Sequence, residues 1–337
     1  MSREKKQKRI IKKILSLLSL PGVPVLVIMT KLPEPIVWVL SELSGRCFAA
    51  FGFVWKKTAM KNLDLVYGNA KTYEEKKQIA KKSMRNVIKM FLECPALFRK
   101  PDKNIKTINI EGEDNIRKAL EQGRGVLVLG CHVGHFLLLI NVLNMKGYPI
   151  SYIYKETKNE RFRTYTKRVI ETLRLNAIPM KPKSVAAKKA LRVLKSNGML
   201  WVALDQSTRE GAMGVEFFGV KTATSQGPAV LAMKTNSVIL PMSMRRNGFL
   251  DHTLIVREPL ELPATTIDSE SIYSNLLMMN GLIEKEILLN PEEWWWFHRR
   301  WKRAHKYTQE NEVPSSVESN VRKDPTELPR TASTDGI

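Results

Sequence analysis

The sequence predicts an α/β protein with a mostly parallel central sheet and helices on both faces, preceded by an N-terminal membrane-associated helical segment. Three observations predict this architecture. Short apolar runs alternate with longer stretches of helical periodicity. The run at residues 126–129 is flanked by glycines and apolar throughout, as in a strand that is buried on both faces. Two apolar stretches follow a basic N-terminus, as in helices that bind a membrane surface.

The composition allows a large core and indicates an anionic partner. Of the 337 residues, 43% are hydrophobic, which is enough for one large or two ordinary domains. The 55 lysines and arginines against 33 acidic residues give a net charge of +22. This balance favours a polyanionic partner or surface, and a merely solvated lysine-rich face is the alternative. The three cysteines lack metal-type spacing, so we expect neither a disulfide framework nor a zinc site. We expect the protein to be in a reducing compartment.

The N-terminal region combines charge with apolar stretches. Seven of the first thirteen residues are basic and one is acidic, and apolar stretches follow at 14–30 and 35–55. The first is short for a transmembrane helix and contains Pro21, and the second contains Glu42 and Arg46, which are costly in hydrocarbon. Together they favour an interfacial or re-entrant membrane anchor that meets anionic head groups. A pair of core helices is the alternative.

Beyond residue 60, helical and strand patterns alternate. We expect helices at 73–97 (ended or kinked by Pro95), 114–122, 136–143, 160–175, 184–195 (with Ser184 as N-cap), about 225–234, and 271–289. We expect strands at 105–110, 126–129, 148–154, 199–204, 238–244 and 253–257, and a loop up to Gly219. The chain then divides into a basic N-terminus with membrane-anchoring helices (1–60), a catalytic domain (61–306) and a disordered polar tail (307–337).

Two polar clusters directly follow predicted strands. His132 and His135 come after the strand at 126–129, and Asp205 and Gln206 come after the strand at 199–204. Because ligands bind at the carboxyl edge of such a sheet, we expect His132 and Asp205 to lie on that edge together. An imidazole there is suited to general-base catalysis. A structural histidine and a capping aspartate are the alternatives.

Three blocks of the sequence carry recognisable motifs. Residues 125–137, GVLVLGCHVGHFL, place a strand before H-x-G-H. Residues 201–233 contain DQ, FFG, T, GP and LA in that order, and residues 291–302 read PEEWWWFHRRWK. These blocks resemble the strand with H-x-G-N-W-E, the DQ…FFG…T…GP…LA pattern and the closing W-x-W-x-H-R-R-W-K of the bacterial lipid A late acyltransferases. Those lauroyl and myristoyl transferases are part of the wider lysophospholipid acyltransferase group. The resemblance covers roughly residues 105–302.

The resemblance implies an enzyme that moves a fatty acyl group from an acyl-carrier-protein or coenzyme A thioester to a hydroxyl of a membrane lipid. The family's H-x4-acid motif pairs a histidine base with a carboxylate. His132 fills the base position, but the acidic position is Leu137. We expect Asp205 to replace the missing acid, and a neutral hydrogen bond from His135 is the alternative. The other acidic candidates are Glu156 and Glu216.

Further site residues are implied by the same resemblance. The substrate-binding candidates are His135, Lys155, Arg168, Gln206, Phe217, Phe218, Gly219 and Thr224. Residues 217–219 are expected to help form an acyl-chain or substrate pocket. Lys155 and Arg168 are expected to meet a phosphate or polarise the thioester carbonyl, and Thr224 is either an N-cap or a site-lining hydroxyl. The block 291–302 is either an aromatic core strip with snorkelling arginines or an interfacial belt.

The leading hypothesis is therefore an O-acyltransferase of the bacterial inner membrane that acts on a lipid A precursor or a related lipid. Because its thioester donors are cytosolic, the catalytic domain would face the cytoplasm. Its partners would be the lipid acceptor, an acidic acyl carrier protein and the anionic membrane surface. The thioester is a co-substrate, and we expect no bound cofactor and no metal. A catalytically weak or silent lipid-binding relative is the alternative that Leu137 motivates, and a nucleic-acid-binding protein is disfavoured because no reader motif is recognised.

Overall fold

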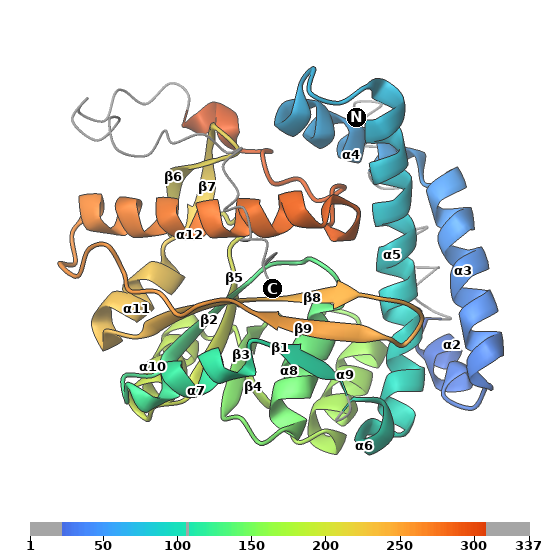
Figure 1. Ribbon diagram of the computed structural model, residues 1–337, viewed down its shortest axis with the longest axis horizontal. Helices are drawn as coiled ribbons and strands as arrows, with labels where there is room; N and C mark the ends of the chain where they lie inside the picture. Colours follow the sequence, from blue (N-terminus) through green and yellow to red (C-terminus); the bar gives the residue numbers. More distant parts are fainter. Residues whose placement is uncertain (1–21, 106–107, 308–337) are drawn as a thin grey trace, which may run out of the picture.

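The computed structural model describes residues 22–105 and 108–307 and is built around a seven-stranded sheet (Figure 1). The strands lie in the order β1-β9-β8-β2-β5-β3-β4. Their bounds are β1 Asn109–Glu111, β2 Val126–Gly130, β3 Ile150–Tyr154, β4 Asn176–Pro179, β5 Met199–Ala203, β8 Val238–Arg246 and β9 His252–Val256. Only β8 and β9 pair antiparallel, and the other neighbours pair parallel. The predicted mostly parallel α/β sheet is confirmed.

Helices cover both faces of the sheet. Their bounds are α2 Gly22–Met29, α3 Glu34–Phe51, α4 Phe53–Tyr67, α5 Tyr73–Arg99, α6 Pro101–Asn104, α7 Glu113–Glu121, α8 Phe136–Met145, α9 Glu160–Thr172, α10 Lys183–Lys195, α11 Gly227–Thr235 and α12 Ser269–Leu289. In β2, Leu127 and Leu129 enter the core that also contains side chains of α10, α11 and α12. Val126 and Val128 enter the core of α7 and α8. Because side chains alternate along a strand, two apolar layers require the continuous apolar run that this sequence has.

Two strand features differ from the sequence-based expectation. The segment predicted as a loop up to Gly219 contains the strand β6 Ala212–Phe217, which forms a hairpin with β7 Val220–Ser225. Its turn consists of Phe218 and Gly219, both with positive φ, and a phenylalanine gives no turn signal there. The strand β4 was also not expected, because it is a short edge strand that ends in Pro179.

Two helix ends also differ. The helix α5 does not end at Pro95 but continues to Arg99. The N-cap of α10 is Pro182 rather than Ser184, which lies inside the first helical turn.

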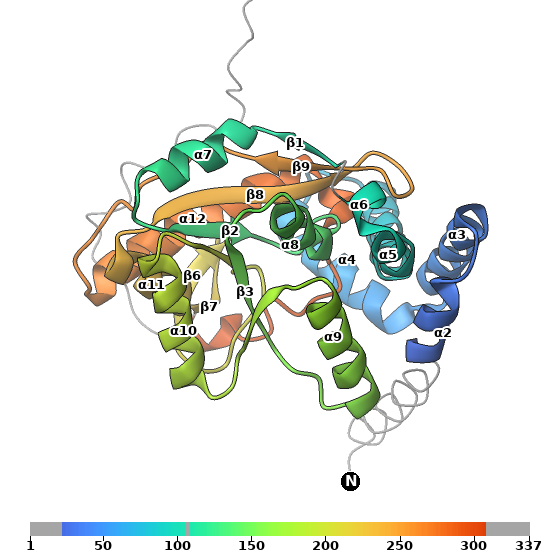
Figure 2. The same ribbon diagram turned by 90° about the horizontal axis from the view of Figure 1, so that it is seen from below.

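The N-terminal helices α2 and α3 lie outside α5, on its side away from the sheet (Figure 2). Small residues of α3, among them Gly45 and Ala49, form its buried face. Its other faces expose large apolar side chains, so α3 is not a core helix. The exposed ones on α2, α3 and α4 are Val27, Ile28, Ile36, Trp38, Val39, Leu40, Leu43, Phe51, Phe53, Val54 and Leu65.

Within the described residues, no single helix has both the length and the apolar composition needed to cross a membrane. The pair α3 and α4 meets those criteria jointly, with a bend of 77° between them. Residues 14–21 of the first apolar stretch and the predicted tail beyond residue 307 lie outside the described residues. The division at residue 60, which falls within α4, stays a prediction.

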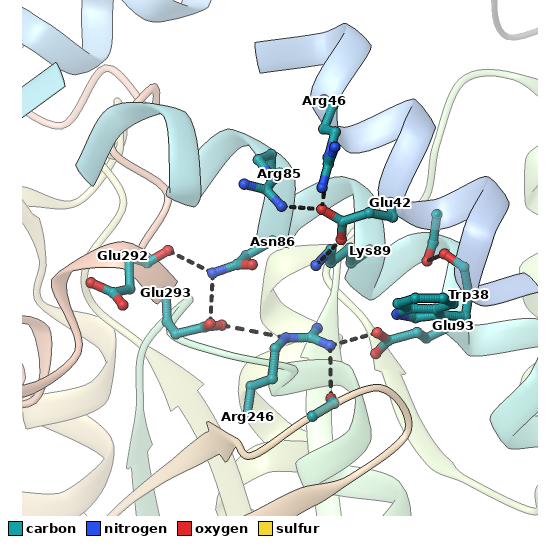
Figure 3. Close-up of polar contacts among 12 residues, drawn as sticks. Trp38, Glu42, Arg46, Arg85, Asn86, Lys89, Glu93, Arg246, Glu292 and Glu293 are labelled. Carbon is teal, nitrogen blue, oxygen red and sulfur yellow. Dashed lines mark hydrogen bonds and ion pairs between the residues drawn. The ribbon is translucent and has the colours of Figure 1, made fainter. Parts of the chain in front are cut away.

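Two clusters of ion pairs share the helix α5, one with α3 and one with the sheet (Figure 3). Glu42 of α3 is paired with Arg85 and Lys89 of α5. Burial opposes its ionisation, but hydrogen bonds from Lys89, Arg46 and Arg85 lower the pKa of Glu42 to about 2. One helical turn beyond Lys89, Glu93 of α5 is paired with Arg246 of β8. The two clusters, both on α5, therefore connect α3 through this helix to the central sheet.

Candidate active site

The site begins where two neighbouring strands end. In the parallel pair of β2 and β5, Gly130 lies opposite Ala203, and these are the last residues of the two strands. His132 and Asp205 each come two residues later. Equal offsets beyond paired strand ends bring the two side chains together, as the sequence predicts.

Asp205 contacts both the ring and the backbone of His132. The ring Nδ1 lies 2.8 Å from Oδ1 and 3.1 Å from Oδ2, and the backbone N–H of His132 donates to Oδ2 at 3.0 Å. Because an ionised carboxylate only accepts hydrogen bonds, this contact assigns the ring proton to Nδ1 and leaves Nε2 as the acceptor. Nε2 is the atom that a general base would use.

The carboxylate of Asp205 is held ionised although it is buried. Burial alone would raise its pKa, but the interaction with the His132 ring and hydrogen bonds from His132 and Trp294 outweigh that effect and lower the pKa of Asp205. The indole N–H of Trp294 donates to Oδ2 at 2.8 Å. A buried charge with three donors is suited to orienting an imidazole.

The loop that carries His132 is fixed by the segment after α12. Val133 and Trp294 form an antiparallel bridge, and the backbone N–H of Gly134 donates to the carbonyl of Glu293. Gly134 has a positive φ of 60°, and a Cβ there would lie 2.1 Å from the carbonyl oxygen of Met244. Only glycine fits this approach.

Three aromatic rings surround the imidazole, while its side chain remains 15% exposed. The ring of Phe136 lies 4.6 Å from that of His132, Trp295 lies 5.3 Å away and Trp201 lies 6.3 Å away, centroid to centroid. The second ring nitrogen of His132, Nε2, lies 3.0 Å from the side-chain amide nitrogen of Gln206. The site thus presents an oriented, partly accessible imidazole in apolar surroundings.

Comparison with known proteins assigns the family. The model of the bacterial lipid A biosynthesis acyltransferase family matches residues 3–303. This chain belongs to that family. The resemblance inferred from the three motif blocks is confirmed, and the chain is an acyltransferase.

Individual relatives agree over most of their length. The chain is 28% identical to the lipid A biosynthesis palmitoleoyltransferase of Escherichia coli K12 over 289 residues, which are 83% of this chain and 90% of the relative. It is 26% identical to the lipid A biosynthesis lauroyltransferase of the same strain over 300 residues, 87% and 92% of the two chains. A lipid A biosynthesis acyltransferase of Haemophilus influenzae is 24% identical over 282 residues, 80% and 86% of the two chains.

His135 does not support the His132 ring of this acyltransferase, so that alternative is wrong. Its side chain is completely buried, with Nε2 3.9 Å from the Cys94 sulfur and the ring 5.2 Å from that of His252. Burial lowers the pKa of His135 well below its usual value, with His252 and Arg246 adding to the effect. Because the His135 ring is fully buried against Cys94 of α5, we interpret it as a structural residue.

The other acidic and basic candidates lie on the surface. Glu156 and Glu216 are exposed, and Asp205 occupies the place for which they were considered. Lys155 and Arg168 are also exposed, and their contact with a phosphate or thioester stays a prediction.

Phe217 and Thr224 are buried, whereas Phe218 is partly exposed and Gly219 is exposed. Phe217 is fully buried, and the guanidinium of Arg300 lies 4.6 Å from its ring centroid. Arg300 donates to the hydroxyl of Thr224 at 2.8 Å. Thr224 is not an N-cap, since α11 begins at Gly227 with Gln226 as its cap. Phe218 and Gly219 form the hairpin turn, and the backbone N–H of Phe218 donates to Glu284 at 2.7 Å.

The tryptophan-rich block divides by position. Trp294 and Trp296 are completely buried, which confirms the core interpretation for these two and excludes an interfacial belt there. Arg300 is buried as well and does not snorkel. Trp295 and Phe297 are partly exposed.

Sequence reasoning missed three site residues. Trp294 holds Asp205, Trp295 covers His132, and His298 interacts electrostatically with both members of the pair. Burial lowers the pKa of His298 to about 4, so the ring is neutral near neutral pH. The motif block contained all three, but no signal in the sequence distinguishes them from their neighbours. Among the described residues, no three His, Cys, Asp or Glu side chains are grouped so that they hold a metal ion.

Proposed function

We propose that this acyltransferase moves a fatty acyl group from an acyl-carrier-protein or coenzyme A thioester to a hydroxyl of a lipid A precursor or a related lipid, with His132 as the general base. The observation that carries the proposal is the contact of His132 with the buried, ionised Asp205 at the sheet edge. The substrate class rests on the names of the relatives, which are lipid A palmitoleoyl and lauroyl transferases.

The pair supports a balanced reaction. The hydroxyl proton passes to Nε2 of His132 while the hydroxyl oxygen bonds to the thioester carbonyl carbon. Asp205 stabilises the imidazolium that forms. The carbon–sulfur bond then breaks, and the imidazolium returns its proton to the departing thiolate. In this structure the side-chain amide of Gln206 lies against Nε2 of His132, so the hydroxyl of the acceptor must displace that amide before it can give up its proton.

The pair also bears on the alternative of a silent lipid-binding relative. That alternative was motivated by Leu137, which stands where the family pattern has an acid. Asp205 supplies a carboxylate to the same ring nitrogen from the neighbouring strand, so an apolar residue at position 137 does not leave the base unsupported.

The exposed apolar side chains of α2, α3 and α4 support attachment to a bilayer surface. A net charge of +22 suits anionic head groups and an acidic carrier protein. We place the protein at the bacterial inner membrane with its site facing the cytoplasm, where the thioester donors are.

The test compares the purified protein with His132→Ala in an assay of acyl transfer from an acyl-carrier-protein thioester to a lipid A precursor. Turnover is expected to fall by roughly 10⁴-fold or more in the variant, at least as much as for loss of the carboxylate that orients the base. His305→Ala, a surface histidine in the short 3-10 helix Ala304–Lys306, is the matched control. Equal product from all three proteins would remove His132 from the mechanism.

A further inference from the structure

We infer that a strip of four aromatic side chains binds the acyl chain of the lipid acceptor. The strip consists of Trp295, Phe297, Phe48 and Trp55, and we call it the aromatic strip. The inference rests on the proposed function and adds the route by which a membrane lipid reaches His132.

Ring contacts run without a break from the base along the strip. The centroid of Trp295 lies 5.3 Å from that of His132, and Trp295 is stacked on Phe297 at 6.0 Å. Phe297 lies 6.1 Å from Phe48, which lies 5.3 Å from Trp55. All four residues are partly exposed, so the strip borders the surface, while Trp295 and Phe297 also pack against the core.

The segment after α12 explains why the strip is exposed. Its side chains alternate between two environments, with Trp294 and Trp296 completely buried and Trp295 and Phe297 on the other side. The buried pair fixes the backbone, through the bond from Trp294 to Asp205 and a bond from the Trp296 indole to the Pro291 carbonyl. The two outward rings are therefore held rigidly beside the base, as a surface that recognises a flexible chain requires.

The far end of the strip lies on the helices that we assign to the bilayer. Phe48 is on α3 and Trp55 on α4, and between them Phe51 and Phe53 are 74% and 67% exposed at the bend. The bend stands beside the N-terminal half of α5 (Figure 1). One end of the strip is thus at the reacting nitrogen, and the other end is at the apolar surface of the molecule.

This arrangement favours the acceptor over the donor as occupant. A membrane lipid must bring its hydroxyl to His132, and taking its chains through water costs about 0.8 kcal/mol for each exposed methylene group. An apolar strip that is continuous with the bilayer-facing helices removes most of that cost. A donor thioester arrives from the aqueous side on a soluble carrier and has no need of contact with α3 and α4.

Phe297→Ala tests the inference, with acylated acceptor in detergent micelles so that bilayer binding plays no part. The KM for acylated acceptor is expected to rise about tenfold, the value for loss of one aromatic contact. The KM for the thioester donor is expected to change less than about twofold, since the donor makes no contact with the ring. The variant also loses selectivity for acylated over chain-free acceptor.

Phe249→Ala is the matched control, because this partly buried phenylalanine in the β8–β9 turn has no ring contact with the strip. Phe297→Leu retains the packing and gives an intermediate acceptor KM, which keeps the test valid if the alanine variant unfolds. An unchanged acceptor KM in both Phe297 variants overturns the inference. A donor KM that rises instead assigns the strip to the donor chain and also overturns it. His132→Ala lowers turnover with either acceptor by the same large factor, so failure of the proposed base is observed separately.

Discussion

Two pairs of histidine and carboxylate border the loop 132–135, and only one of them has a partly exposed imidazole. In the first, His132 contacts Asp205 at 2.8 Å, and in the second, His252 contacts Glu93 at 3.2 Å. Both carboxylates are buried, but the His132 side chain is 15% exposed and that of His252 is fully enclosed. Contact between an imidazole and a carboxylate is therefore not sufficient to identify a catalytic pair.

The partners of the two carboxylates differ as well. Asp205 accepts from the neutral indole of Trp294, and among the described residues no lysine or arginine is paired with it, so the His132 ring is its one ionisable partner by direct contact. Glu93 is also bound to the cation of Arg246. Burial lowers the pKa of His252 in spite of Glu93, so this ring stays neutral at neutral pH. Arg246 takes the charge that would otherwise stabilise an imidazolium, and the second pair is structural.

The largest expected difference between the pairs is in turnover. Asp205→Asn is expected to lower kcat by about 10⁴-fold, because an amide can no longer fix the tautomer or stabilise the imidazolium. Glu93→Gln, the matched change in the second pair, is expected to leave kcat within about threefold of the parent protein. Steady-state acyl transfer measures both. A loss of more than a hundredfold in Glu93→Gln would mean that the second pair takes part in the chemistry.

Stability should show the reverse order. Glu93→Gln leaves the largely enclosed Arg246 cation, whose side chain is 10% exposed, without its main partner, and breaking such a pair costs about 3–5 kcal/mol of the free energy of unfolding. Asp205→Asn retains an acceptor for the Trp294 indole, so its cost is expected to be smaller. Urea denaturation measures both, provided that unfolding is two-state. The comparison fails if Asp205→Asn is the less stable variant.

The two pairs also differ in how much of them the sequence could predict. His132 and Asp205 follow buried strands of recognisable pattern, and two equal offsets place them on one edge. Glu93 and His252 are 159 residues apart, and Trp294 is 89 residues from the carboxylate it holds. These contacts depend on how α5 and the segment after α12 pack on the sheet. The pattern of apolar residues along the sequence does not predict that packing. The motif assigned His135 to the site, but its burial beside His252 follows from that same packing.

Glu293 links the two pairs and gives a smaller, pH-dependent effect. Its carboxylate lies 3.9 Å from Arg246, and its backbone carbonyl holds Gly134 beside the first pair. Burial raises the pKa of Glu293 to about 7, so the folded protein favours the protonated form. The contribution of Glu293 to the free energy of unfolding is therefore fully present below pH 4.5, the ordinary pKa of a glutamate. It is lost as the pH rises through the pKa of about 7 that the folded protein gives this group.

Glu293→Gln removes this dependence. The variant is expected to match the parent protein near pH 4.5 and to exceed its free energy of unfolding by up to about 3 kcal/mol at pH 8. Asn86 remains a partner for the amide, which limits other losses. Thermal unfolding at the two pH values measures the difference. Equal stabilities at pH 8 would show that Glu293 is ionised without cost in the folded protein.

The smallest expected effect tests whether Asp205 fully replaces the acid that the family's H-x4-acid motif has at position 137. Leu137→Glu restores the acid of the H-x4-acid pattern on α8, and a silent relative that lacks only this acid should gain activity from it. In this structure Nδ1 of His132 already donates to Asp205, so a second carboxylate has no proton of that ring to accept. Leu137 also packs against the core of α8, where a carboxylate is poorly solvated. We therefore expect kcat to change less than about twofold or to fall, and a clear increase would show that Asp205 only partly fulfils the role of the missing acid.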